Sequence, residues 1–186
     1  MKKQQKQLIL LIAMLVLLAG GYFGIRQYNK AQANKASLDT NIPMTTVSGE
    51  DIVKISYDYE GVTYSMEKDG DTWYDASDRS RKLTQYSITA MASNLAGLKA
   101  TQQIENVTDL NQYGLTEGYR TISFETASES YTFYLGDQNA ITKEYYLCKP
   151  SESTVYTVGA TLANRFNYTL EDLTEEEEET TEGATS

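Results

Sequence analysis

The residue types that could do chemistry in this chain are few. Its 186 residues include no histidine and one cysteine, Cys148. Without histidine there is no Ser-His-Asp or Cys-His nucleophile system, no two-histidine metal motif and no imidazole pH switch. A single cysteine leaves no intramolecular disulfide, CxxC redox pair or cysteine-rich zinc site. Aspartate and glutamate are therefore the residues left for acid–base catalysis, as in hydrolases that use paired carboxylates.

The carboxylates do not form a recognisable catalytic or metal pattern. Asp69-Gly70-Asp71, followed by Asp75 and Asp78, superficially suggests a calcium loop, but it departs from the EF-hand template. The ligand, glycine and closing glutamate expected at the fifth, sixth and twelfth positions are replaced by Trp73, Tyr74 and Ser80. Most other acidic residues fall in turns or on alternating solvent positions. We therefore predict a protein that is not an enzyme, without catalytic residues, bound metal or cofactor.

Tyrosine is unusually frequent, with 15 residues. A tyrosine offers a large apolar area with a polar tip, which suits half-buried sheet faces and recognition surfaces alike. Most of the tyrosines are expected to pack on sheet faces. A candidate binding surface for a glycan or a peptide consists of Tyr57, Tyr59, Tyr64, Tyr145 and Tyr146. Cys148 alternates with Tyr146, so it is expected to be a buried small side chain rather than a reactive thiol.

The N-terminal part predicts a membrane anchor. Residues 8–25 carry no charge and lie between Lys6 and Arg26. A helix of that length, at about 1.5 Å per residue, nearly matches a hydrocarbon core of about 30 Å. We expect a short basic flank over 1–7 and a single signal-anchor span over 8–25 in a bacterial cytoplasmic membrane, with the rest of the chain outside the cytoplasm. A signal peptide cleaved near Ala19-Gly20-Gly21 is the alternative.

The charge distribution outlines the remaining segments. The formal net charge is −10, and the part between residues 39 and 170 has 18 acidic and 10 basic residues. A body of that sign repels phosphate backbones, which argues against a nucleic-acid partner. We expect a polar linker over 26–49, a folded extracytoplasmic domain over 50–170, and a disordered acidic tail over 171–186.

Alternating apolar residues predict a three-stranded meander over 52–75, with turns at Glu60-Gly61 and Asp69-Gly70. The period then changes over 84–98, where apolar residues form one helical stripe and Thr84 is the candidate N-cap. The stripe residues are Ile88, Met91, Ala92, Leu95 and Leu98. This helix must pack on the meander, because a small sheet cannot bury enough apolar area alone.

The second half repeats this pattern of strands followed by a helix. Strands are predicted over 121–125, 131–135, 144–148 and 154–158, and a short closing helix lies around Leu162 and Phe166. The fold class expected is α+β, with a mostly antiparallel sheet and one main amphipathic helix packed on it. The best-matching pieces, 54–57 and 121–124, suggest two related β-rich halves.

The order of landmarks resembles the bacterial domain-of-unknown-function 4340 family over roughly residues 50–166. The landmarks are Asp51-Ile52-Val53-Lys54-Ile55, Glu67-Lys68-Asp69-Gly70 ahead of Trp73, Leu95-Ala96-Gly97-Leu98-Lys99-Ala100, Tyr113-Gly114-Leu115, Leu135-Gly136-Asp137, Tyr145-Tyr146 and Val155-Tyr156-Thr157-Val158. Glu117-Gly118-Tyr119 stands where the family pattern leads us to expect a proline. The resemblance implies a membrane-anchored extracytoplasmic domain without assigned chemistry. Some relatives are described as auxiliary parts of ABC-type transport systems linked to gliding motility.

Several landmarks have a structural interpretation. Trp73 is expected to anchor the meander in the core. Gly136 is likewise expected to have a structural role. Tyr113-Gly114-Leu115 is expected to end one helical turn, with Gly114 in the left-handed conformation and Leu115 docked in the core.

Three functions remain open at the level of sequence. The first is a non-enzymatic binding or scaffold module at the outer membrane face, an accessory of an ABC-type transport or cell-envelope complex. Such a module could take a partner segment along an edge strand. The second is a ligand sensor with a tyrosine-lined pocket, and the third is a carboxylate-based envelope hydrolase.

Overall fold

The computed structural model of the protein describes residues 21–22, 41–115 and 120–175. The chain divides into two compact units, Met1–Thr40 and Asn41–Ser186. In the first unit only Gly21 and Tyr22 are described, and both are helical. No helix within the described ranges has the length and apolar character needed to cross a membrane. The predicted span over 8–25 otherwise lies outside the described residues.

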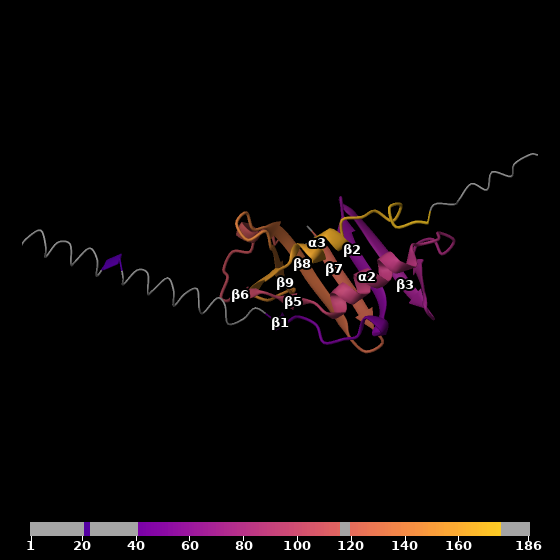
Figure 1. The fold of residues 1–186 in the computed structure, drawn as a ribbon, viewed down its shortest axis with the longest axis horizontal. Coiled ribbons are helices and arrows are strands. Elements are labelled where there is room, and N and C mark those ends of the chain that lie inside the picture. Colours follow the sequence, from indigo (N-terminus) through magenta and orange to yellow (C-terminus); the bar gives the residue numbers. More distant parts are fainter. Residues whose placement is uncertain (1–20, 23–40, 116–119, 176–186) are drawn as a thin grey trace, which may run out of the picture. The chain divides into compact units, whose positions relative to one another are not determined.

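The second unit is built on an eight-stranded sheet with the order β4-β3-β2-β7-β8-β9-β10-β6 (Figure 1). All neighbouring strands in it pair antiparallel. Figure 1 shows the helices α2 and α3 on one face of this sheet. The α+β class and the mostly antiparallel sheet are thus confirmed.

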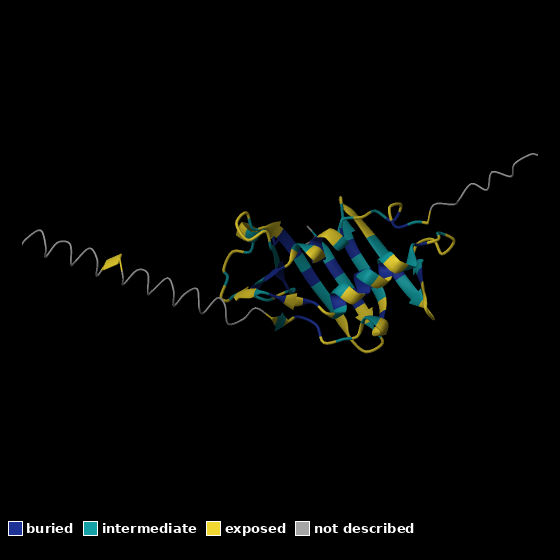
Figure 2. Cartoon of the chain, viewed as in Figure 1, coloured by how far each residue is buried: buried dark blue, intermediate teal, exposed yellow. Residues whose placement is uncertain are grey.

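The predicted meander is present as β2 (Ile52–Tyr59), β3 (Val62–Asp69) and β4 (Thr72–Asp75). Glu60 and Gly61 both have positive φ, 53° and 77°, as a two-residue hairpin turn requires. Alternate residues of β2 are buried, which gives the banded pattern along the strands in Figure 2. The period-2 pattern therefore assigned the strands, but the buried face alternates only from Ile55 onward, because a bulge between Ile52 and Lys54 buries Ile52 and leaves Val53 40% exposed.

The predicted helix forms as α2 (Gln85–Ala96), with Thr84 at its N-cap. The Thr84 side chain makes no capping hydrogen bond, and its backbone N–H instead donates to the Leu173 carbonyl at 2.7 Å. The predicted stripe residues of the helix are buried. The amphipathic prediction holds, whereas the expected capping chemistry is replaced by a contact with the C-terminal segment.

The second half contains β7 (Thr121–Thr126), β8 (Ser130–Gln138), β9 (Tyr145–Cys148), β10 (Val155–Val158) and the short helix α3 (Ala160–Arg165). The strands β2 and β7 pair inside the sheet as its third and fourth strands, with Ser56 opposite Ser123. Consecutive strands follow outward on either side of this pair until β10. Each half is thus a run of antiparallel strands followed by a helix, and the pairing of β2 with β7 joins the two halves.

The folded unit begins before the expected boundary at residue 50. The strand β1 (Ile42–Pro43) pairs with β5 (Lys99–Ala100), and Met44 is buried. The Thr45 hydroxyl donates to the carbonyls of Leu95 and Ala96, at 2.6 and 2.9 Å. Because the last carbonyls of a helix have no partner within the helix, this segment satisfies them. The linker prediction is therefore wrong for residues 41–49.

The expected tail also begins too early. Leu170 and Leu173 are buried, and Leu83 forms a β-bridge with Thr174. The backbone N–H of Glu175 donates to the Lys82 carbonyl at 2.9 Å. Residues 171–175 thus belong to the folded unit, and the rest of the predicted acidic tail, 176–186, lies outside the described residues.

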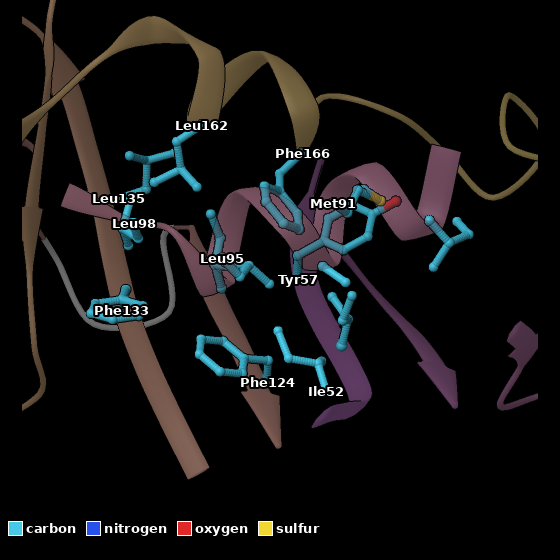
Figure 3. Packing of buried hydrophobic residues seen from close by; sticks show 14 of the residues in the cluster. Ile52, Tyr57, Met91, Leu95, Leu98, Phe124, Phe133, Leu135, Leu162 and Phe166 are labelled. Atoms are coloured by element: carbon cyan, nitrogen blue, oxygen red, sulfur yellow. The ribbon is translucent and has the colours of Figure 1, made fainter. Parts of the chain in front are cut away.

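The main core lies between the sheet and its helices. Figure 3 shows Tyr57 of β2 and Phe124 of β7 facing Met91 and Leu95 of α2 and Phe166 after α3. These five side chains are at most 1% exposed. Burial of large aromatic and aliphatic side chains is the dominant stabilising contribution to such a fold.

A smaller core lies on the opposite face of the sheet. Consecutive residues of a strand point to opposite faces, and Leu147 belongs to the main core while Cys148 belongs to the smaller one. Leu115, Cys148 and Val155 are its buried members, and side chains from β6 (Gln102–Ile104) and residues 107–113 pack against them. The segment after β6 therefore covers the far face of β9 and β10.

Candidate functional site

Strand β3 has a free edge where β4 ends. The pairing of the two strands runs from Asp69–Thr72 to Met66–Asp75, and one more backbone bond joins the Ala76 N–H to the Ser65 carbonyl at 3.0 Å. Beyond that point no described strand pairs with this side of β3. The backbone groups of alternate residues point to the same side of a strand, so those of Thr63 face this edge as Ser65 does.

The free edge opens into a pocket of about 580 Å³, which we call the β3-edge pocket. Its walls come from β3, the loop after β4 and the segment after α3. The lining residues are Val62, Thr63, Tyr64, Ser65, Asp75, Ala76, Ser77, Arg81, Thr169, Leu170 and Glu171. Small-molecule and peptide-sized sites commonly have volumes of roughly 300–1,000 Å³. The pocket is therefore large enough to hold a short extended segment.

A buried carboxylate lies at one end of this pocket. Asp75 is 1% exposed, and its Oδ1 accepts hydrogen bonds from the backbone N–H and the hydroxyl of Ser77, at 2.8 and 2.7 Å. Its Oδ2 lies 3.1 Å from Nε of Arg81 but accepts no hydrogen bond, because the Nε–H is not aligned with it. Asp75 thus holds the guanidinium by charge and leaves it incompletely bonded.

Arg81 is the exposed partner of that pair. Its side chain is 32% exposed, and among the described residues no acceptor bonds its terminal amino groups. The nearby Asp78 accepts from the hydroxyl and the backbone N–H of Ser80, and these bonds lower the pKa of Asp78, with a smaller contribution from the Arg81 charge. Arg81 therefore lines the pocket with a planar guanidinium whose terminal amino groups have no acceptor among the described residues.

The segment after α3 forms the opposite wall. Asp172 accepts hydrogen bonds from the backbone N–H and the hydroxyl of Thr169, at 2.8 and 2.7 Å, and these bonds lower the pKa of Asp172. They fix a turn that places Thr169, Leu170 and Glu171 on the pocket. Glu171 is exposed, so its charge is largely solvated.

The outer edge of β4, unlike that of β3, is closed. The side-chain amide of Gln85 accepts from the backbone N–H of Trp73 at 2.7 Å and donates to the Trp73 carbonyl at 2.9 Å. The Gln85 amide thus makes the two hydrogen bonds that the backbone of a neighbouring strand would make. Natural sheets commonly blunt their edges in ways that prevent unwanted pairing. The Val62-Thr63-Tyr64-Ser65 stretch has β-branched and aromatic residues but no lysine or proline, so its edge lacks such protection.

A second hollow, of about 750 Å³, lies near the β7–β8 turn. Its charged lining residues are Glu50, Asp51 and Glu129, and its lining includes no basic residue. It also contains no buried charged side chain. Among the residues that the structure describes, no group of three or more His, Cys, Asp and Glu side chains could hold a metal ion. The β3-edge pocket is therefore the better candidate site.

The predicted tyrosine surface does not form. Tyr57 is 1% exposed, stacks edge-on against Phe166, and donates its hydroxyl to the Tyr168 carbonyl at 2.9 Å. Burial is the main cause that raises the pKa of Tyr57. The prediction is wrong for this residue because strand β2 is central and its inner face is covered by α2. Tyr59 and Tyr64 are partly buried against the same core, and only Tyr64 lines the pocket.

The other two tyrosines of that set point away from each other. Tyr145 packs against the main core, whereas Tyr146 belongs to the smaller core on the opposite face. The Tyr146 ring contacts Tyr113 edge-on at 4.8 Å, and its hydroxyl accepts from the Asn139 amide at 2.7 Å. Consecutive strand residues cannot share one sheet face, so the pair cannot form a single patch.

The residues with a predicted structural role occupy the places expected of them. Trp73 is 2% exposed, and Leu115 is 3% exposed in the smaller core. Gly114 follows the turn η2 (Asn111–Tyr113) with φ of 67°, in the left-handed region. Gly136 lies so close to the Tyr113 carbonyl and the Leu115 side chain that a β-carbon there would overlap them. The two landmark tripeptides Tyr113-Gly114-Leu115 and Leu135-Gly136-Asp137, which are far apart in sequence, therefore pack against each other.

Cys148 is fully buried, and burial raises the pKa of its thiol to about 11. A thiol that stays protonated in this way is a poor nucleophile. This agrees with the expected role of a small packing residue.

Sequence reasoning missed the elements that make the pocket. At the level of sequence, Asp75 is considered only as part of a calcium-loop pattern, Arg81 is not singled out, and Thr63 is one position of a regular strand. The structure shows that β4 has only four residues against eight in β3, a difference in length that the predicted meander over 52–75 did not contain. That mismatch leaves half of β3 without a partner on one side.

A comparison with curated proteins and with solved structures found no match to this chain. A family model described as a domain of unknown function, DUF4340, matches residues 73–184, more than half of the sequence. The match begins at Trp73, later than the expected start near residue 50, and it extends past Phe166 through the segment that closes the pocket. The chain therefore belongs to the DUF4340 family of domains of unknown function.

Proposed function

We propose that this chain is a non-enzymatic binding domain that takes an extended segment of a partner protein along the free edge of β3. The single observation that carries the proposal is the unprotected edge of β3 before Ser65, where no described strand pairs with the outward backbone groups of Thr63 and where a pocket opens. Adding a strand satisfies backbone donors and acceptors that otherwise bond to water, and neighbouring side chains then select among sequences.

The proposal includes the cellular setting expected from the sequence. Residues 8–25 would hold the domain at the outer face of a bacterial cytoplasmic membrane, and the partner would be a member of an ABC-type transport or cell-envelope complex. Uncharged length and flanking basic residues support the anchor. Extraction of isolated membranes at alkaline pH tests it: the full-length chain should stay in the membrane pellet. Release of the uncleaved chain into the supernatant would refute the anchor.

The binding edge is tested by site-specific photocrosslinking of the full-length chain in intact cells. A photoreactive amino acid replaces Val62, which is 49% exposed and lines the pocket. The control position is Ile141, 91% exposed in the loop between β8 and β9. We expect one discrete adduct from position 62 that position 141 does not give.

The adduct must also depend on the strand edge. Thr63→Pro removes the backbone N–H that faces the pocket, and edge positions of that kind tolerate proline because no sheet hydrogen bond is lost. This variant should fold and lose the adduct. The matched control is Ala127→Pro in the distant β7–β8 turn, at the second position of the turn, which favours proline, and it should keep the adduct. An adduct that persists in folded Thr63→Pro, or no adduct from position 62, would overturn the proposal.

The ligand-sensor alternative keeps one supporting observation, because Tyr64 lines the β3-edge pocket. A small ligand would bind without needing the backbone of Thr63. Binding that survives Thr63→Pro but is lost in Tyr64→Ala would favour the sensor.

A further inference from the structure

The β3-edge pocket contains a guanidinium that the fold positions but does not saturate. Arg81 follows β4 by six residues, and its backbone N–H donates to the Asp78 carbonyl at 3.1 Å, which closes a turn. The turn brings the Arg81 side chain back over Asp75, the last residue of β4. Asp75 Oδ2 lies nearest to Nε, and no acceptor among the described residues bonds the two terminal amino groups, so their N–H donors are available to a ligand.

The buried Asp75 explains why such an arrangement would exist. Asp75 Oδ2 has less than 1 Å² of exposed surface and accepts no hydrogen bond, which is costly for a buried oxygen. A pair that served stability alone would be expected to satisfy this atom. Positioning an arginine for a ligand is a function that can offset the cost, because residues at binding sites often violate rules that hold in the core.

From this geometry we infer that Arg81 binds a carboxylate of the segment that pairs with β3. The inference rests on the proposed function, and it specifies the chemistry of the partner. A planar guanidinium with two free amino groups matches the two oxygens of a carboxylate, and such charge-assisted bonds are about twice as strong as neutral ones. The carboxylate is either the C-terminus of the partner or an Asp or Glu side chain within it.

The other charges of the pocket are compatible with this ligand. Asp75 is already paired with Arg81, and Glu171 is exposed at the opposite wall, where solvent screens it. Glu171 should nevertheless weaken the binding of any anion slightly. The variant Glu171→Gln should therefore tighten binding of a carboxylate probe and leave binding of a neutral probe unchanged.

The test uses the full-length chain in detergent micelles and an array of acetylated hexapeptides of valine, isoleucine, threonine and tyrosine. Each peptide is made with a free C-terminal carboxylate, with a carboxamide, and as a carboxamide with one internal aspartate. We expect one of the two carboxylate forms to bind about tenfold more tightly than the neutral form. The form that shows the gain identifies the source of the carboxylate.

Variants assign the gain to Arg81. Arg81→Gln should bind all three forms equally, and Arg81→Lys should keep part of the preference because it retains charge without the planar geometry. The matched control is Arg79→Gln, two positions away. Arg79 pairs with Asp69 at 3.3 Å and does not line the pocket. That control should keep the preference.

The outcomes separate this inference from the proposed function. Equal binding of neutral and carboxylate peptides that is lost in Thr63→Pro would refute the role of Arg81 and leave strand addition standing. A preference that survives Arg81→Gln, or that Arg79→Gln abolishes equally, would also refute it. No binding of any peptide form up to millimolar concentration would count against both.

Discussion

Replacement of Gly136 by alanine tests whether the two landmark tripeptides are packed as the structure places them. A β-carbon at Gly136 would overlap the Tyr113 carbonyl oxygen and lie 3.0 Å from Cδ2 and Cγ of Leu115. The backbone at Gly136 has no positive φ, so alanine adds no conformational strain and the whole effect is steric. The main obstacle is a backbone atom, which cannot rotate away as a side chain can.

The size of the effect follows from the cost of overpacking. Forcing an extra carbon into a well-packed site costs about 1–3 kcal/mol, and contact with backbone places Gly136→Ala near the upper end. For a domain of this size, a loss of about 2–3 kcal/mol lowers the melting temperature by roughly 8–12 °C. That is a large part of a total stability that is typically about 5–15 kcal/mol.

The assay is thermal unfolding of the full-length chain in detergent, followed by near-ultraviolet circular dichroism of its aromatic residues. The matched control is Gly159→Ala, because nothing lies within 4 Å of a β-carbon at Gly159 and its φ is −61°. That control should change stability by less than about 1 kcal/mol, because the lower entropy of the unfolded chain is opposed by the loss of the glycine that the N-cap of α3 favours. If Gly136→Ala had the same melting temperature as the control, the structure would be wrong about the contact between the two tripeptides.

Two further predictions concern the sheet edge and the buried thiol. Gln85→Ala leaves the backbone N–H and carbonyl of Trp73 without their partner, so it should lower the free energy of unfolding, measured by urea denaturation, by about 2 kcal/mol. The control Gln103→Ala, on the exposed β6, should change this free energy little. Equal effects of the two variants would contradict the role of Gln85 in closing the edge of β4. The pKa of the Cys148 thiol is about 11 in the folded chain against 9 when exposed. The contribution of the protonated thiol to the free energy of unfolding is therefore complete below pH 9 and is lost as the pH rises to about 11. Denaturation from pH 8 to 11 should show a smaller loss for Cys148→Ala than for the parent chain, and parallel pH profiles would refute burial as the cause.

The sequence predicted most of the sheet and its main helix because those elements are local. The alternation of Ile122 and Phe124 with polar residues predicts one buried strand face, and the spacing from Ile88 to Leu95 predicts one buried helix stripe. Glycine at a turn or at the end of a helical turn, as at Gly114, follows from φ alone. Such features depend on neighbours within a few residues.

The ends of the domain could not be predicted in the same way. Thr45 and Leu173 occur in polar segments without any apolar period. The Thr45 hydroxyl bonds the Leu95 carbonyl at the end of α2, and the Leu173 carbonyl bonds the Thr84 N–H at its start, while the Leu173 side chain is buried. Composition indicates a linker or a tail for such segments, whereas the tertiary structure uses them to complete the first and last turns of the helix.

The sequence by itself determined which residue types are available for chemistry, which faces of the strands and of the helix are apolar, and where the turns fall. Only the tertiary structure decided that Tyr57 is core rather than surface, that β3 outlasts its neighbour, and that Arg81 returns to Asp75. The physical reason is that a side chain's periodicity is fixed by its own backbone, while its burial and partners are fixed by what lies across the sheet. A free edge is a relation between two strands, and neither strand carries it alone.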